Sequence, residues 1–272
     1  MRRFIFILLS SLILIPCCYA NKGLYIFTFS TNSIEKSIGD SIYHLYIKKS
    51  ETKSLNIIPI TISEGKISTS ISDFKNKLDS LEYNKLKSDY IIIGIGAIGS
   101  AAATISASKT NPEALILISG VGIDGKDLIF RFLASSTYIV DLPNADTHTI
   151  RAQIRDELNG SGQKSIIPEE WSELSGYIPA NFFMNILCPV YAAYGLSDSI
   201  VEWYDNCRGV ESLLPQLQYN ENVFRVFPNT GYCLRVSQTN CNVPMIGDIT
   251  PQKIDLINIE ALVDIVNWLM KE

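Results

Sequence analysis

A glycine-rich turn between two apolar segments constrains the fold of this chain most. Residues 90–100 read Tyr-Ile-Ile-Ile-Gly-Ile-Gly-Ala-Ile-Gly-Ser, and their first half has the apolar, β-branched composition of a buried strand. The small residues at 101–107 favour a helix, and residues 114–119 predict a second buried strand after Asn111-Pro112. A strand, a tight turn, a helix and another strand in this order form a βαβ unit, which requires a parallel sheet.

The rest of the chain repeats this alternation. We expect strands at residues 24–29, 55–61, 90–94, 114–119, 189–194 and 222–227, and helices at 38–47, 72–86, 147–158 and from Thr250-Pro251 onward. The pattern predicts one α/β domain over residues 21–272, with a doubly wound, mostly parallel sheet and the 90–94 strand away from its edges. Residues 121–186, which include an expected strand at 137–142, are less regular and are interpreted as a small cap insertion.

The first twenty residues have the layout of a secretory signal peptide. Arg2 and Arg3 precede an apolar core at residues 4–15, and Cys18-Tyr19-Ala20 forms a small-x-small cleavage site. We therefore expect cleavage after Ala20 and export to the periplasm or the cell exterior, with a lipid anchor on Cys17 or Cys18 as the alternative. No other segment is apolar for long enough to predict a membrane span.

Charge and cysteine content exclude several classes of partner. The formal net charge is −5 and no run of basic residues occurs, so nucleic acid is not an expected ligand. No C-x-x-C pair is present, and we predict neither a metal site nor a cofactor. In an exported chain, Cys233 and Cys241 flank a short loop and predict a disulfide, and Cys188 with Cys207 would form a second. Four buried thiols are the alternative.

Three segments resemble the landmarks of the α/β-hydrolase family. The turn at residues 94–98 is similar to the family's nucleophile elbow, G-x-S-x-G, with Gly96 in the place of the serine. Residues 189–198 resemble the strand and loop that carry the acid of the catalytic triad, here Asp198. Residues 224–234 resemble the late strand and loop that carry the histidine, where this chain has Tyr232. The resemblance implies an α/β-hydrolase fold in which these three residues converge at the carboxyl ends of the strands.

The same resemblance shows what the chain lacks. A triad needs a nucleophile, a base and an acid in that family's order, but glycine has no nucleophile and both histidines, His44 and His148, precede Asp198. The family's His-Gly oxyanion motif is also absent after the first strand. We therefore expect a catalytically impaired protein that binds a small molecule or a protein partner in the former substrate cleft, with Tyr232 hydrogen-bonded to Asp198.

Two alternatives use other residues. In the first, the protein is an active esterase-type acyl hydrolase with Ser100 as nucleophile and His148 as base. In the second, Gly94, Gly96 and Gly99 form a dinucleotide-binding G-x-G-x-x-G motif, although the acidic residue expected after the next strand is missing. For Asp198 and His148, simpler roles are a loop carboxylate held by backbone N–H groups and a residue flanking the start of a helix.

Overall fold

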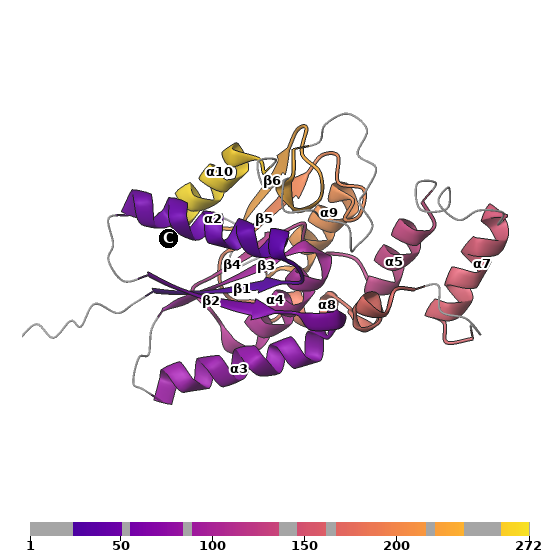
Figure 1. The fold of residues 1–272 in the computed structure, drawn as a ribbon, viewed down its shortest axis with the longest axis horizontal. Helices are drawn as coiled ribbons and strands as arrows, with labels where there is room; N and C mark the ends of the chain where they lie inside the picture. The colour runs from indigo at the N-terminus through magenta and orange to yellow at the C-terminus, as the bar shows by residue number, and fades with distance from the viewer. Residues whose placement is uncertain are drawn as a thin grey trace, which may run out of the picture.

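A computed structural model describes residues 24–50, 55–83, 89–135, 146–161, 167–215, 221–236 and 257–271. Six strands in these residues form one sheet in the order β2-β1-β3-β4-β5-β6, and all neighbouring strands are parallel (Figure 1). The strands are β1 Leu24–Ser30, β2 Leu55–Thr61, β3 Tyr90–Ile95, β4 Ala114–Ile118, β5 Val190–Gly195 and β6 Val223–Phe227. The predicted fold class is confirmed, and β3 lies inside the sheet as expected.

Helices cover both faces of the sheet (Figure 1). One face is covered by α2 Ser33–Ser50 and α10 Ile259–Leu269. The opposite face is covered by α3 Ile67–Tyr83, α4 Gly96–Thr110, α8 Ala180–Phe183 and α9 Trp203–Leu213. Between β4 and β5, α5 Gly125–Leu133 and α7 Thr147–Leu158 extend beyond the sheet, together with the short helices η2 Glu169–Trp171 and η3 Glu173–Gly176. Two further short helices in the described residues are η1 Ser63–Gly65 and η5 Tyr232–Leu234.

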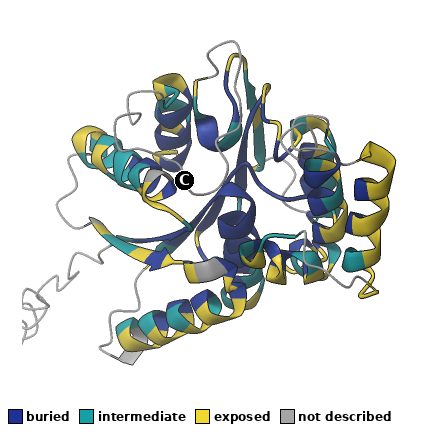
Figure 2. Ribbon diagram, turned by 45° about the vertical axis from the view of Figure 1, so that its right-hand side comes forward, coloured by how far each residue is buried: buried dark blue, intermediate teal, exposed yellow. Residues whose placement is uncertain are grey.

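Burial on both faces explains why the central strands β3, β4 and β5 are apolar along almost their whole length. In β3, Ile92 faces the α3 and α4 side, whereas Ile91 and Ile93 face α2 and α10. In β5, Tyr194 and Tyr191 divide between the two faces in the same way, and both are completely buried. Figure 2 shows the central strands buried throughout. Each large apolar side chain buried in this way stabilises the fold by about 1.5–3 kcal/mol.

Some boundaries differ from those predicted. The expected final helix from Thr250 begins at Ile259, because Asn258 caps it by accepting the Ala261 N–H at 3.2 Å, and Ile257 forms an antiparallel bridge with Arg235 instead. The expected strand at 114–119 ends at Ile118, since Ser119 has left-handed φ of 52°. The predicted strand at 137–142 and the signal peptide at 1–20 lie outside the described residues. In the described ranges, no helix is long and apolar enough to cross a membrane.

The cysteines do not pair as predicted. Cys188, Cys207 and Cys233 are buried free thiols, and Cys241 lies outside the described residues. Cys188 precedes the amino end of β5, whereas Asn206, next to Cys207, accepts the Gly122 N–H at 3.0 Å beyond the carboxyl end of β4. A strand of six residues separates the two ends of the sheet by about 20 Å. A disulfide requires Cα atoms within about 7 Å, so the predicted Cys188–Cys207 bond is wrong.

Candidate functional site at the carboxyl edge of the sheet

The site is organised by the turn from β3 into α4. Gly96, the first residue of α4, has φ of +75°, a conformation that favours glycine. A Cβ atom on Gly94 would lie 2.6 Å from the Ala103 Cβ, and one on Gly99 would lie 2.6 Å from the Phe29 carbonyl oxygen. Gly94 and Gly99 therefore allow β3, α4 and β1 to approach closely, and Gly96 supplies the left-handed turn, so packing and backbone geometry account for the G-x-G-x-x-G pattern.

The Tyr232 hydroxyl fills the space in front of Gly96. Tyr232 begins η5, after β6, and its hydroxyl oxygen accepts the Ala97 N–H at 2.9 Å. The same hydroxyl hydrogen-bonds the carboxyl group of Glu35. A Cβ atom on Gly96 would lie 2.5 Å from Glu35 Oε1 and closer still to the Tyr232 hydroxyl oxygen. No side chain fits at position 96 unless these two groups move.

Glu35 is the site residue that sequence reasoning missed. It lies in the first turn of α2 and is only 3% exposed. Its Oε2 accepts the Thr31 N–H at 2.6 Å and the Thr31 hydroxyl at 2.8 Å, and the Cys233 thiol lies 3.9 Å from its Oε1. Burial raises the pKa of Glu35 to about 7, although its hydrogen bonds to Thr31, Asn32 and Tyr232 act in the opposite direction.

A local sequence signal for Glu35 does exist. Asn32 accepts the Glu35 N–H at 2.9 Å, so Asn32-Ser-Ile-Glu35 follows the spacing of a helix capping box. The Glu35 carboxyl group reaches back to accept the Thr31 N–H. This pattern predicts a helix start directly after β1, and it stands at the place where the family's His-Gly motif is missing.

Asp198 is buried and anchors three loops. Its Oδ1 accepts the N–H groups of Ile200 at 2.9 Å and Val201 at 2.8 Å, and its Oδ2 accepts the Ser119 hydroxyl at 2.8 Å. The Ser119 oxygen in turn accepts the Cys233 N–H at 3.0 Å. Asp198 therefore fits the simpler role expected from the sequence, a loop carboxylate held by backbone N–H groups. Burial raises the pKa of Asp198 to about 6, with the three hydrogen bonds lowering it.

Asp198 and Tyr232 are joined through other residues. The direct bond expected between them is replaced by the contacts of Tyr232 with Ala97 and Glu35, while Asp198 reaches the Tyr232 loop through Ser119 and Cys233. Both linking residues have left-handed backbones, with φ of 52° and 53°. Strained backbone of this kind persists only where surrounding contacts fix it. Gly96, Tyr232 and Asp198 therefore lie at one edge of the sheet without forming a triad.

The residues of the alternative esterase site are not brought together. Ser100 is completely buried in α4, where its hydroxyl donates to the Ala97 carbonyl at 3.0 Å and accepts the Val121 N–H at 3.2 Å. His148 is exposed at the start of α7, which projects at the far end of the molecule (Figure 1). Asp146 caps that helix, and His148 flanks its start. His44 is exposed on α2.

The helix start that a dinucleotide would need is also occupied. Phosphate groups bind at the free N–H groups of a helix N-terminus. At the start of α4, the Ala97 N–H already donates to Tyr232, and the carboxyl group of Glu35 lies beside it. Across the described residues, no group of His, Cys, Asp and Glu side chains has the arrangement of a metal site.

Solved structures share this fold. An esterase from Pyrococcus furiosus superposes with a TM-score of 0.54 at 14% identity, covering 92% of this chain and 82% of that one. A thermostable carboxyl esterase from Bacillus coagulans superposes with a TM-score of 0.53 at 12% identity, covering 92% of this chain and 89% of that one. A monoacylglycerol lipase from Paleococcus ferrophilus superposes with a TM-score of 0.51 at 12% identity, covering 92% of this chain and 95% of that one. No protein-family model and no curated protein sequence matches the chain. The structure is an α/β-hydrolase fold.

Proposed function

We propose that this protein is a catalytically impaired α/β-hydrolase-like protein that binds a small molecule or a protein partner at the carboxyl edge of its sheet. The observation that carries the proposal is the Tyr232 hydroxyl, which accepts the Ala97 N–H and occupies the space in front of Gly96. In the family, the serine side chain stands in that space. Here the protein's own side chains fill it.

The groups that would stabilise an oxyanion are also engaged. The family's oxyanion hole uses the N–H of the residue after the nucleophile and an N–H from the loop after an earlier strand. Ala97 and Thr31 hold the corresponding positions under the proposed alignment. The Ala97 N–H donates to Tyr232 and the Thr31 N–H donates to Glu35. Because removal of a single oxyanion donor costs a hydrolase about a hundredfold or more in rate, occupation of both supports the loss of hydrolysis.

Ligand binding is proposed outside this filled centre. Open α/β sheets bind ligands at the carboxyl ends of their strands. Leu196, which directly follows β5 at this edge, is 51% exposed, an apolar contact available to a partner. We also propose that residues 1–20 direct export and are removed. A native protein whose intact mass corresponds to a start at Asn21 would support this, and a retained Met1 would contradict it.

The alternative is a working esterase, and it is supported by the activities in the names of the similar structures. Such an enzyme would need a nucleophile other than a free Ser100, whose hydroxyl is buried and doubly hydrogen-bonded. It would also need a base other than the exposed His148. The two functions therefore differ in whether any serine reacts with an electrophile.

A fluorophosphonate probe, which labels activated serines, separates the two functions. We expect no labelling of the wild-type protein or of the Gly96→Ser variant, since the latter gains a nucleophile without a base. The double variant Gly96→Ser with Tyr232→His should label slowly. Gly96→Ser with Tyr232→Phe is the matched control, because it removes the same hydroxyl without supplying a base. Wild-type labelling that disappears on substitution of one serine would overturn the proposal.

A further inference from the structure

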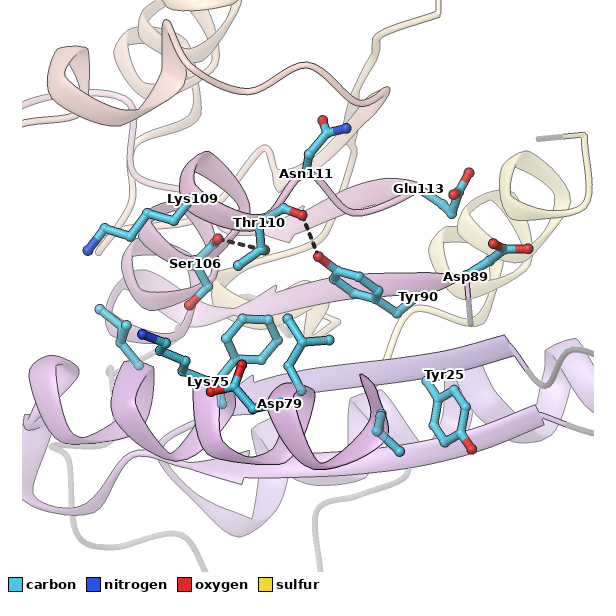
Figure 3. A pocket seen from close by; sticks show the side chains of 14 residues that line it. Tyr25, Lys75, Asp79, Asp89, Tyr90, Ser106, Lys109, Thr110, Asn111 and Glu113 are labelled. Carbon is cyan, nitrogen blue, oxygen red and sulfur yellow. Dashed lines mark hydrogen bonds between the residues drawn. The ribbon is translucent and has the colours of Figure 1, made fainter. Parts of the chain in front are cut away.

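A second cavity lies far from this edge, between α3, α4 and the amino ends of β1 and β3 (Figure 3). Its volume is about 560 Å³, within the range typical of small-molecule sites. The lining residues come from α3, α4, the strand starts and the loop before β4. Those used below are Phe74, Leu78, Tyr90, Ser106, Lys75 and Lys109. Ser106 follows Gly96 by ten residues, which along α4 is about 15 Å.

The floor of the cavity is apolar and aromatic. Phe74 and Leu78 are 1% and 8% exposed, and the Phe74 and Tyr90 rings lie 6.4 Å apart between centroids. The Tyr90 hydroxyl donates to the Thr110 carbonyl at 2.7 Å, so this polar group is already satisfied. A hydrocarbon chain placed on this floor would cover apolar surface without displacing a hydrogen bond.

Ser106 supplies the one unsatisfied polar group of the floor. It is 1% exposed, and within the described residues its hydroxyl oxygen has no hydrogen-bond partner. Other hydroxyls of α4 behave differently: Thr104 donates to the Ser100 carbonyl at 2.8 Å, and Thr110 donates to the Ser106 carbonyl at 2.9 Å. A buried hydroxyl without a partner is unfavourable, so a polar ligand atom beside Ser106 would be stabilised.

The charges around the cavity are unevenly placed. The ammonium groups of Lys75 and Lys109 lie at the same end as Ser106 (Figure 3), and no ion pair involves either lysine in the part of the chain that the structure describes. Asp89 and Glu113 lie at the opposite end of the cavity, the end at which Tyr25 also lies. Asp79 also lines the cavity, one helical turn after Lys75. Its carboxylate would repel an anion bound at the end that carries the two lysines.

We propose that this cavity binds a small amphiphilic carboxylate. Its head group lies among Ser106, Lys75 and Lys109, and its apolar tail lies on Phe74 and Tyr90. The Ser106 hydroxyl donates to one carboxylate oxygen, and the two ammonium groups supply the countercharge. The proposal does not depend on the function assigned to the Gly96 edge, because the two regions share no lining residue.

Calorimetric titration of the full-length protein with octanoate tests the site. We expect saturable binding that weakens about three- to tenfold in the double variant Lys75→Gln/Lys109→Gln, because two partly screened charges are removed. Ser106→Ala should weaken binding about tenfold or more through loss of a hydrogen bond to a charged group. The double variant Lys36→Gln/Lys48→Gln, an equal change of charge at two exposed positions of α2, is the matched control and should leave the affinity unchanged.

Two further ligands fix the chemical class. Octan-1-ol should bind more weakly than octanoate, and octylammonium should not compete with it. The site is wrong if octanoate shows no saturable binding at low millimolar concentration, or if it binds the lysine double variant and Ser106→Ala as tightly as the wild type. Octan-1-ol that binds as tightly as octanoate would overturn the assignment of an anionic head group.

Discussion

The two ends of α4 differ in whether their buried polar groups have hydrogen-bond partners. At the first turn, the Ala97 N–H, the Tyr232 hydroxyl and the Glu35 carboxyl group satisfy one another and leave no space for a side chain at Gly96. Ten residues later, the Ser106 hydroxyl has no partner in the described residues and borders a cavity. The region where hydrolases of this fold carry out chemistry is thus the more tightly closed one here.

Substitution of Gly96 should give the largest loss of stability. Gly96→Ala adds both a left-handed backbone penalty and a clash with Tyr232 and Glu35, so we expect a loss of about 3–5 kcal/mol in the free energy of unfolding. Gly160 is the matched control, because its φ is +82° and nothing lies within 4 Å of its Cβ position. Gly160→Ala should cost only about 1–2 kcal/mol in urea unfolding. Equal losses at both positions would show that the Gly96 edge is not closed.

The buried Glu35 predicts a pH dependence. Its pKa is raised to about 7 in the folded protein, so the folded state binds more protons than the unfolded state between pH 4.5 and 7. This stabilisation is fully present below pH 4.5 and is lost as the pH rises through 7. Glu35→Gln should therefore remove about 2–3 kcal/mol of the stability difference between pH 5 and pH 8.

Urea unfolding at these two pH values measures this effect. Asp198, with its pKa raised to about 6, adds a smaller loss in the same direction to wild type and variant alike. The difference between the two proteins thus isolates Glu35. Parallel pH profiles for wild type and Glu35→Gln would contradict the burial of this carboxyl group.

Removal of the Tyr232 hydroxyl should have an intermediate effect. Tyr232→Phe leaves the buried Ala97 N–H without its acceptor and removes a bond to Glu35, which predicts a loss of about 1–3 kcal/mol. Tyr204→Phe is the control, since Tyr204 is 44% exposed and should change stability by less than about 0.5 kcal/mol. If the two variants unfold at the same urea concentration, the Tyr232 contact does not contribute to stability.

The smallest effect is expected at the other end of the helix. Ser106→Ala removes a buried hydroxyl that has no described partner and replaces serine with a better helix former, so stability should stay constant or rise by up to about 1 kcal/mol. Ser100→Ala, in the same helix, loses two hydrogen bonds and should cost about 1 kcal/mol. Thermal unfolding of the two variants in parallel would test this difference in sign.

The sequence was sufficient for the fold because its central strands are apolar along almost their whole length and its turn residues are distinctive. Residues 90–119 predict the βαβ unit, and the positions of Gly96, Asp198 and Tyr232 after the parallel strands β3, β5 and β6 predict that all three lie at one edge. Hydrogen bonds between distant segments were not predictable in this way. The Tyr232 contact joins residues 135 positions apart, and no local pattern specifies which of several buried groups the phenol meets. The wrong Cys188–Cys207 prediction has a similar origin. It assumed that α9 returns along the whole length of β5 and brings Cys207 beside Cys188, which no local pattern specifies.

The interlocking of Gly96, Tyr232 and Glu35 has an evolutionary consequence. A serine at position 96 clashes while Tyr232 and Glu35 remain, and a histidine at position 232 gains nothing while position 96 is glycine. Each single step toward a triad is therefore either destabilising or without benefit to selection. Under the proposed function, serine catalysis could be regained only through several substitutions at once, so the closed edge would act as a barrier to reversal.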